Sequence, residues 1–116
     1  MEDDPEVRAG IVEGLRLLRY NVREASDGLA GLAELGQRLP DLMMADFLMP
    51  GMNGAELIAQ ARRLYPRLPI LLATGYADMA EVEKVVGAQA VLSKPFDLEA
   101  LGTAVARELR KSREVA

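Results

Sequence analysis

The chain contains no cysteine and no histidine, and only 4% of its 116 residues are aromatic. Without cysteine it has no disulfide, no thiolate metal site and no cysteine nucleophile. Without histidine it has no His-based catalytic triad, no His-ligated zinc site and no phosphohistidine of its own. Any chemistry must therefore use carboxylates, hydroxyls, amines and backbone groups.

The chain also lacks an excess of positive charge and a long apolar run. Its formal net charge is -4, whereas a nucleic-acid surface is basic. No run approaches the ~18–20 apolar residues of a membrane span, and no signal peptide precedes the first acids. Half of the residues are apolar, which is enough for a core in a domain of this length. We expect one cytoplasmic domain over residues 1–116, with no direct contact to nucleic acid or membrane.

Helix and strand patterns alternate along the chain. The residues that predict helix starts are Asp4, Asp27, Asn53, Asp78 and Asp97, all of them good N-caps. Near-continuous apolar runs at 41–49, 69–75 and 90–93 predict strands buried on both faces. Residues 21–26 alternate weakly and predict a strand near a sheet edge, and residues 112–116 predict a frayed tail. This order predicts an α/β fold with a doubly wound parallel sheet.

A polar residue interrupts or closes each apolar run: Asp46, Thr74 and Lys94. In open α/β sheets, ligands bind beyond the carboxyl ends of the strands. A buried carboxylate needs a cation, and for Asp46 either Lys94 or a metal ion would supply it. The acids Glu2 and Asp3 of the opening stretch MEDDPEVR are expected beside Asp46. Because such a site offers only oxygen ligands, it favours Mg2+ over Ca2+ or Zn2+.

A carboxylate, a hydroxyl, a lysine and Mg2+ together suit phosphoryl chemistry. Asp46 would be the nucleophile, Lys94 and the metal would neutralise phosphoryl oxygens, and Thr74 would hydrogen-bond one of them. The competing interpretation is structural: a satisfied buried carboxylate, a plain strand-end threonine and a lysine that reaches solvent. Asp4 and Glu6 are expected to be cap and first-turn residues of a helix, not ligands.

The segments EDDP, ADFLMPGMNG, LLATGYA and LSKPF, in this order and at these separations, resemble a response-regulator receiver domain of two-component signalling. The resemblance covers nearly the whole chain and implies a flavodoxin-like fold with strand order 2-1-3-4-5. It implies that a partner histidine kinase or phosphotransfer protein phosphorylates Asp46. The domain itself would then be no enzyme beyond self-phosphorylation and dephosphorylation.

The resemblance also implies roles for the other site residues. The implied Mg2+ ligands are Glu2, Asp3, Asp46 and the backbone carbonyl of Leu48. Thr74 would be the switch hydroxyl, and Lys94 would precede a proline, Pro95, that is often cis in the family.

The chain departs from the receiver pattern in three places. Val91 stands where receivers commonly carry an aromatic residue, with Tyr76 as a speculative substitute. The segment between Thr74 and Lys94 is short, which predicts a trimmed fourth helix. The apolar strand that precedes the acidic pair in receivers is missing apart from Met1, so the sheet would carry a gap of ~10 Å where strands normally lie ~4.8 Å apart.

Two explanations of the missing strand remain open. The reading frame starts at an internal methionine of a longer one, or the chain rearranges or pairs its exposed strand edges with another copy in a homodimer. The chain would be either a stand-alone receiver or a part of a larger protein, namely a regulator or a hybrid kinase. The sequence slightly favours the hybrid kinase.

We therefore predict a phospho-accepting receiver that signals by conformational change. The alternative is a degenerate receiver that acts only as a protein-interaction module because its metal pocket is incomplete. A phosphatase of the haloacid-dehalogenase kind is disfavoured, since such enzymes place a second aspartate two residues after the nucleophile, where this chain has Leu48.

Overall fold

The computed structural model describes residues 1–2, 4–46, 54–75 and 91–115. The elements in these ranges are α1 (Pro5–Leu17), α2 (Gly28–Gln37), β1 (Met43–Asp46), α3 (Gly54–Leu64), β2 (Ile70–Thr74), β3 (Val91–Ser93) and α5 (Leu98–Val115). The turn expected at 50–54, with its Asn53 cap, and the helix expected after Asp78 lie largely or wholly outside the described residues. No helix of the described part is both long enough and apolar enough to cross a membrane.

Three of the predicted helix starts are confirmed by capping hydrogen bonds. The Asp4 carboxylate accepts from the backbone N–H groups of Glu6 at 2.9 Å and Val7 at 3.3 Å. Asp27 caps α2 and Asp97 caps α5 in the same way, each by accepting from the N–H three residues on, at 2.7 and 2.8 Å. These carboxylates satisfy N–H groups that have no partner inside the helix.

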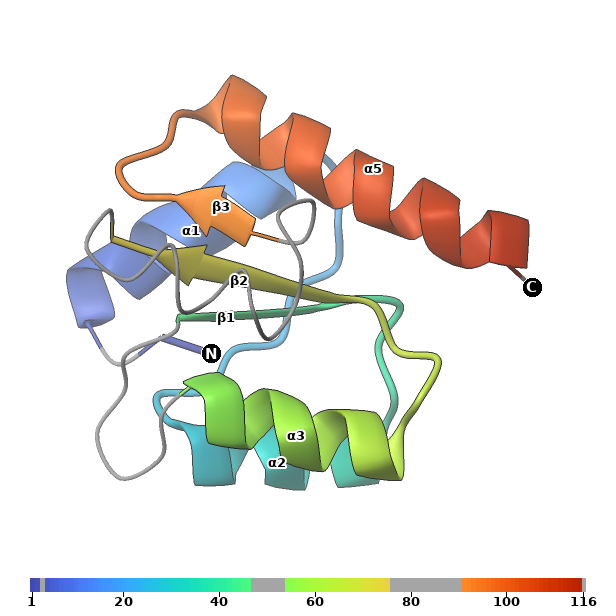
Figure 1. The fold of residues 1–116 in the computed structure, drawn as a ribbon. Helices are drawn as coiled ribbons and strands as arrows, with labels where there is room; N and C mark the ends of the chain where they lie inside the picture. The colour runs from blue at the N-terminus through green and yellow to red at the C-terminus, as the bar shows by residue number, and fades with distance from the viewer. Residues whose placement is uncertain (3, 47–53, 76–90, 116) are drawn as a thin grey trace.

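The strands form one parallel sheet in the order β1-β2-β3. Figure 1 shows α2 and α3 on one side of this sheet and α1 and α5 on the other. All five residues of β2, the middle strand, are buried. The predicted α/β architecture with a doubly wound parallel sheet is therefore confirmed.

The side chains of β2 divide the core between the two faces. Ile70 and Leu72 pack with Leu57 of α3 in one buried cluster, whereas Leu71 packs with Leu101 of α5 in another. Successive strand residues point to opposite faces of a sheet. A strand with helices on both faces must therefore be apolar at every position, which is why the run is continuous.

Met1 and Glu2 lie against the free side of β1. The N-terminal ammonium of Met1 donates to the carbonyl of Met44 at 2.7 Å, and the Asp46 N–H donates to the Met1 carbonyl at 3.0 Å. On the other side, the Glu2 N–H donates to the carbonyl of Ala25 at 3.0 Å. These two residues therefore connect β1 to the segment that precedes α2, and the expected gap is closed at this end.

The strand predicted at residues 21–26 is wrong, because this segment forms no strand. A strand needs a neighbour that pairs with several successive residues. Beside residues 21–26 lie only Met1 and Glu2. Among the described residues, a single backbone hydrogen bond, from the Glu2 N–H to the Ala25 carbonyl, joins these two to the segment.

Helix α5 continues to Val115, and the fraying expected for residues 112–116 stays a prediction. An ion pair between Lys111 and Glu108, 3.6 Å apart and one turn from each other, lies near this end. Pairs at this spacing add a few tenths of a kcal/mol to a helix.

We expect Gly31→Ala in α2 to be less stable than Gly10→Ala in α1. An added Cβ at Gly31 would overlap the side chain of Met1, whereas nothing lies within 4 Å of the corresponding atom at Gly10. Both variants gain about 1 kcal/mol of helix propensity, but the overlap costs about 1–3 kcal/mol. Urea unfolding of both variants measures this difference, and equal stabilisation would show that Met1 does not pack there.

Candidate functional site

The parallel register brings three predicted site residues to one edge of the sheet. Asp46 ends β1 opposite Ala73, and Thr74 ends β2 opposite Ser93. Lys94 follows β3 directly, and its backbone N–H donates to the Thr74 carbonyl at 2.8 Å. The peptide bond between Lys94 and Pro95 is cis, as the resemblance implies. Three neighbouring strand ends thus supply a carboxylate, a hydroxyl and an amine.

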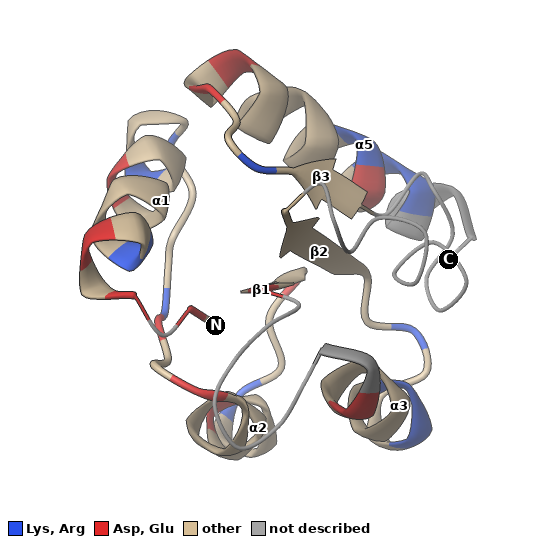
Figure 2. Ribbon diagram, turned by 60° about the vertical axis from the view of Figure 1, so that its left-hand side comes forward, with Lys and Arg blue, Asp and Glu red and all other residues tan. Residues whose placement is uncertain are grey.

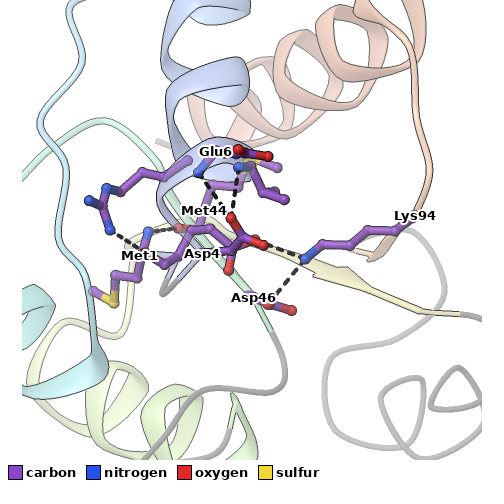
Figure 3. A network of polar contacts seen from close by, with 9 residues as sticks. Met1, Asp4, Glu6, Met44, Asp46 and Lys94 are labelled. Carbon is purple, nitrogen blue, oxygen red and sulfur yellow. Dashed lines mark hydrogen bonds and ion pairs between the residues drawn. The ribbon is translucent and has the colours of Figure 1, made fainter.

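Lys94 connects two carboxylates that are far apart in the sequence. Its Nζ lies 2.9 Å from Glu2 Oε1 and 3.1 Å from Asp46 Oδ2 (Figure 3). The side chains are 5% exposed for Glu2, 14% for Asp46 and 27% for Lys94. A carboxylate as buried as Glu2 requires a cation, and the ammonium provides it. Figure 2 shows the N-terminus of the chain close to β1.

The surroundings of Lys94 raise its pKa. Burial by itself would lower the pKa of this ammonium, but the hydrogen bonds and charges of Glu2 and Asp46 outweigh burial and raise the pKa above 10.5. The Met1 ammonium shows the opposite balance, because its burial lowers the pKa below 8.0. Lys94 is thus firmly a cation at neutral pH.

Arg8 is a site residue that the sequence did not reveal. Its Nη1 donates to the Glu2 carbonyl at 2.9 Å, and its Nε lies 3.3 Å from Glu24 Oε1. The guanidinium therefore fixes the backbone of Glu2 from the first turns of α1. Nothing in the spacing of Arg8 signals this role, since an arginine near a helix start is usually a surface residue.

Thr74 is almost wholly buried, with 1% of its surface exposed. Its Oγ1 donates to the carbonyl of Gly75 at 3.3 Å, which is a long hydrogen bond. A hydroxyl rotates freely about its C–O bond, so it can exchange this weak local partner for an anionic oxygen at the strand ends. Thr74 lies one residue beyond Ala73, which is paired with Asp46.

The structure brings Glu2, Asp46 and Lys94 into direct contact, as predicted for the two carboxylates and the lysine. Asp4 caps α1 and is exposed, which confirms that it is a cap residue. Asp3 and Leu48, the other two implied metal ligands, lie outside the described residues.

The donor atoms of the site fit a hard cation. Glu2 and Asp46 offer carboxylate oxygens, and the chain holds no cysteine or histidine that would favour a softer metal. Within the described ranges, no third acidic residue joins these two in a cluster. Both carboxylates contact the ammonium of Lys94, so the two side chains are already directed at one centre of positive charge.

Comparisons with known proteins agree with this geometry. Residues 1–106 match the model of the response regulator receiver domain family. The sensor kinase CckA of Brucella abortus is 34% identical over 96% of the chain and 12% of its own length. The response regulator MprA of Mycobacterium leprae is 32% identical over 97% of the chain and 50% of its own length. The chain thus spans half or less of these two relatives.

A solved structure shows the same fold. The response regulator receiver domain protein of Methanospirillum hungatei is 26% identical, with a TM-score of 0.90 over 99% of this chain and 94% of that one. The likeness covers both chains almost completely, so it extends to the whole domain.

We expect Lys94→Met to lower the free energy of unfolding at pH 7, because Glu2 and Asp46 would lose their shared cation. A buried polar group left without its partner costs about 1–3 kcal/mol and a charged one more, but the partial exposure of Lys94 reduces the loss to about 1–2 kcal/mol. Lys111→Met is the control for the loss of one positive charge, since the Lys111 side chain is 41% exposed and its ammonium lies 3.6 Å from Glu108, at the farther range of an ion pair. Urea unfolding of both variants measures the loss.

The same pair of proteins tests the raised pKa of Lys94. The pKa of Lys94 is higher in the folded protein than the value of 10.5 for the unfolded chain. The ion pairs therefore contribute their full stability below pH 10.5, and this contribution is lost as the pH rises through the folded-state pKa. The difference between wild type and Lys94→Met should therefore be constant up to pH 10.5 and shrink above it. A difference that shrinks well below pH 10.5 would contradict the ion-pair geometry.

Proposed function

Because the chain belongs to the response regulator receiver domain family, we propose that Asp46 is its phosphoacceptor in a two-component phosphorelay. Receiver domains accept a phosphoryl group and are generally not enzymes. The observation that carries the proposal is the position of Asp46 at the end of β1, with Lys94 Nζ 3.1 Å from its carboxylate. The phosphoryl donor is a phosphorylated histidine on a partner kinase or phosphotransfer protein, since the chain has no histidine of its own.

The residues of the site divide the transfer between them. A carboxylate oxygen of Asp46 forms a bond to phosphorus while the bond from phosphorus to the donor imidazole nitrogen breaks, and the electron pair stays on that nitrogen. The Lys94 ammonium neutralises charge on the phosphoryl oxygens. The Thr74 hydroxyl turns from the Gly75 carbonyl toward one of these oxygens. This rearrangement at the end of β2 is the start of the conformational signal.

We also propose that the site uses Mg2+, which receiver domains generally bind at the phosphorylation site. Glu2 and Asp46 would hold it, together with Asp3 and the backbone carbonyl of Leu48 according to the family pattern. When bound, Mg2+ neutralises phosphoryl oxygens during transfer. The part of the chain that is described contributes the two carboxylates and fixes Glu2 through the Arg8 contact to its carbonyl.

Asp46→Asn should abolish phosphorylation. The amide keeps the size of the side chain but removes the nucleophilic oxygen pair. Asp41→Asn is the matched control, since Asp41 is exposed and precedes the opposite end of β1. Incubation with Mg2+ and acetyl phosphate, followed by intact mass measurement, should show one added phosphoryl group on wild type and Asp41→Asn and none on Asp46→Asn. Removal of Mg2+ with EDTA should abolish the gain in all three.

Failure of wild type to gain a phosphoryl group under these conditions would contradict the proposal. A protein that stays unmodified, yet binds a histidine-kinase partner equally with and without Mg2+, would be the interaction module of the alternative hypothesis. Phosphorylation of Asp46→Asn at wild-type level would place the acceptor elsewhere.

Glu2→Gln should weaken Mg2+ binding roughly 10-fold or more, by the scale of metal-site substitutions. Asp4→Ala is the control from the same acidic stretch. Because Asp4 caps α1, its loss should cost about 1 kcal/mol of stability and leave Mg2+ affinity unchanged. Calorimetric titration with MgCl2 measures the affinity and urea unfolding the stability. Equal weakening by both substitutions would indicate a general charge effect instead of a site.

A further inference from the structure

Every described helix ends on the same side of the domain. The strands are parallel and the helices return in the opposite direction, so the helices end where the strands begin (Figure 1). The packing supports this placement. Leu15 of α1, Leu42 before β1 and Leu109 of α5 pack against one buried cluster, and Leu35 of α2 lies in the other cluster with Tyr65, which follows α3. This side lies opposite the strand ends that form the candidate site.

Three segments on this side carry arginines around an exposed leucine. They are RLLR at 16–19, RL at 38–39 and RRLYPR at 62–67. The side chains of Leu17, Leu39 and Leu64 are 67%, 52% and 54% exposed. The arginines of the three segments are exposed as well, namely Arg16, Arg19, Arg38, Arg62, Arg63 and Arg67. Figure 2 shows basic residues in α3 and in the segment after it. We call these arginines and leucines the basic end.

Helix dipoles explain only a part of this charge. A cation in the last turn stabilises a helix, and Arg16 of α1 and Arg63 of α3 lie in such turns. Arg19, Arg38 and Arg67 follow the last residues of α1, α2 and α3. Single exposed leucines are common on protein surfaces, but here each one lies beside these arginines. Such a surface suits a partner that is both anionic and apolar.

The backbone at Arg19 shows that folding alone does not favour an arginine there. Its φ is 71°, a left-handed conformation that is unfavourable for a residue with a Cβ. The Tyr20 N–H donates to the Leu15 carbonyl at 3.0 Å, and the Arg19 N–H donates to the Arg16 carbonyl at 2.9 Å. This is the helix ending at which glycine is usual. A glycine would therefore be more stable, and the arginine indicates a use for its charge.

The acids near the basic end leave its charge positive. Glu34 lies 3.3 Å from Arg23, and Glu108 lies 3.6 Å from Lys111, so each of these carboxylates already has a cation beside it. Asp41 is exposed on this side. One exposed carboxylate among so many arginines does not reverse the sign of the surface.

The net charge of -4 does not prevent contact between the basic end and an anionic surface. Asp4, Asp27 and Asp97 cap helices at the opposite end of the domain. Salt limits electrostatic forces to about 8 Å at physiological ionic strength, whereas the domain measures 33 × 31 × 27 Å. The distant acids therefore add little repulsion. The net charge alone suggested that the chain avoids membranes, because it does not reveal how the charges are distributed.

We propose that the basic end binds the surface of an anionic lipid bilayer. The arginines would contact the headgroup phosphates, since basic residues near such a surface are attracted to its negative potential. Leu17, Leu39 and Leu64 would insert between the headgroups, where apolar side chains leave water. The chain would lie on the membrane without crossing it.

The arrangement of the three segments favours a bilayer over an acidic peptide or a nucleic acid. Helix α1 lies on one face of the sheet, and α2 and α3 lie on the other. A peptide helix is only about 10–12 Å across, so it would contact one side of the sheet, whereas a membrane surface can contact both sides at once. A purely anionic partner would also place charged groups against the exposed leucines, which a bilayer does not.

The bound orientation leaves the candidate phosphorylation site accessible. The basic end and Asp46 lie at opposite ends of the parallel strands, so a membrane at one end does not cover the other. Membrane binding itself uses none of the residues assigned to phosphoryl transfer. The inference therefore does not rest on the proposed function.

Sedimentation of the chain with sucrose-loaded vesicles tests the proposal. The chain should bind vesicles of phosphatidylcholine that contain about 40% phosphatidylglycerol, and should not bind pure phosphatidylcholine. The bound fraction should fall as NaCl is raised from about 0.05 to 0.5 M, because salt screens the attraction. Soluble poly-L-glutamate serves as an anionic partner that has no apolar phase.

Two matched pairs of variants locate the contact. Leu17→Ser should weaken binding about fivefold or more, whereas Leu29→Ser, which changes a 72% exposed leucine at the start of α2 on the opposite side, should not. Asp41→Asn should strengthen binding, by up to about fivefold. Glu99→Gln makes the same change in net charge in the first turn of α5 and should have no effect.

Arg19→Gly separates membrane binding from folding. Glycine adopts the left-handed conformation without strain, so the variant should have a higher Tm than wild type. It should nevertheless bind anionic vesicles about fivefold more weakly, because one arginine is lost from the surface. A purely structural role of Arg19 would not combine higher stability with weaker binding.

Several outcomes would overturn the proposal. These are no binding to the anionic vesicles, equal effects of Leu17→Ser and Leu29→Ser, equal effects of Asp41→Asn and Glu99→Gln, or unchanged binding by Arg19→Gly. Binding to poly-L-glutamate as tight as to vesicles would assign the basic end to an acidic polymer instead of a membrane. Asp46→Asn lacks the phosphoacceptor but should bind vesicles like wild type, which keeps failure of this proposal distinct from failure of the proposed function.

Discussion

The ammonium group of Lys94 holds together two carboxylates that belong to opposite parts of the chain. Asp46 is placed by the parallel pairing of β1 with β2, whereas Glu2 comes from the N-terminus, 92 residues away from Lys94. Lys94 itself is positioned by its backbone bond to Thr74. Two like charges near each other in a poorly solvated site are stable only with this cation between them. The site therefore exists only when three strand ends and the N-terminus are in register.

Two residues at the N-terminus carry much of this constraint. Met1 pairs with β1 through both of its backbone groups, and Glu2 bonds to Ala25 on the opposite side. Arg8 then fixes the Glu2 carbonyl from α1. The backbone of Glu2 is thus tied down on both its N–H and its C=O. Its side chain is left to point at Lys94, which explains how so short a segment can hold a buried carboxylate in place.

Much of the fold and the chemical part of the site could be predicted from the sequence. Asp46 interrupts the apolar run at 41–49, Thr74 lies near the end of the run at 69–75, and Lys94 directly follows the run at 90–93. Parallel strands bring their carboxyl ends to one edge of the sheet, so this pattern predicts that the three residues lie close together. The contribution of Arg8 could not be predicted, because it depends on how α1 lies against Glu2. The strand expected at 21–26 failed for a related reason. Weak alternation of apolar and polar residues shows only that a segment could be a strand. Whether it forms one depends on a neighbouring strand to pair with, which the local sequence does not reveal.

The edge of β1 and the ion pairs of Lys94 are connected by two neighbouring residues. Met1 bonds to the backbone of β1, and Glu2, the next residue, contacts Lys94. A backbone can transmit position over one residue without any change of side-chain packing, because the peptide bond between them is rigid. The pairing of Met1 with β1 therefore helps to place the Glu2 carboxylate beside Lys94, which also contacts Asp46.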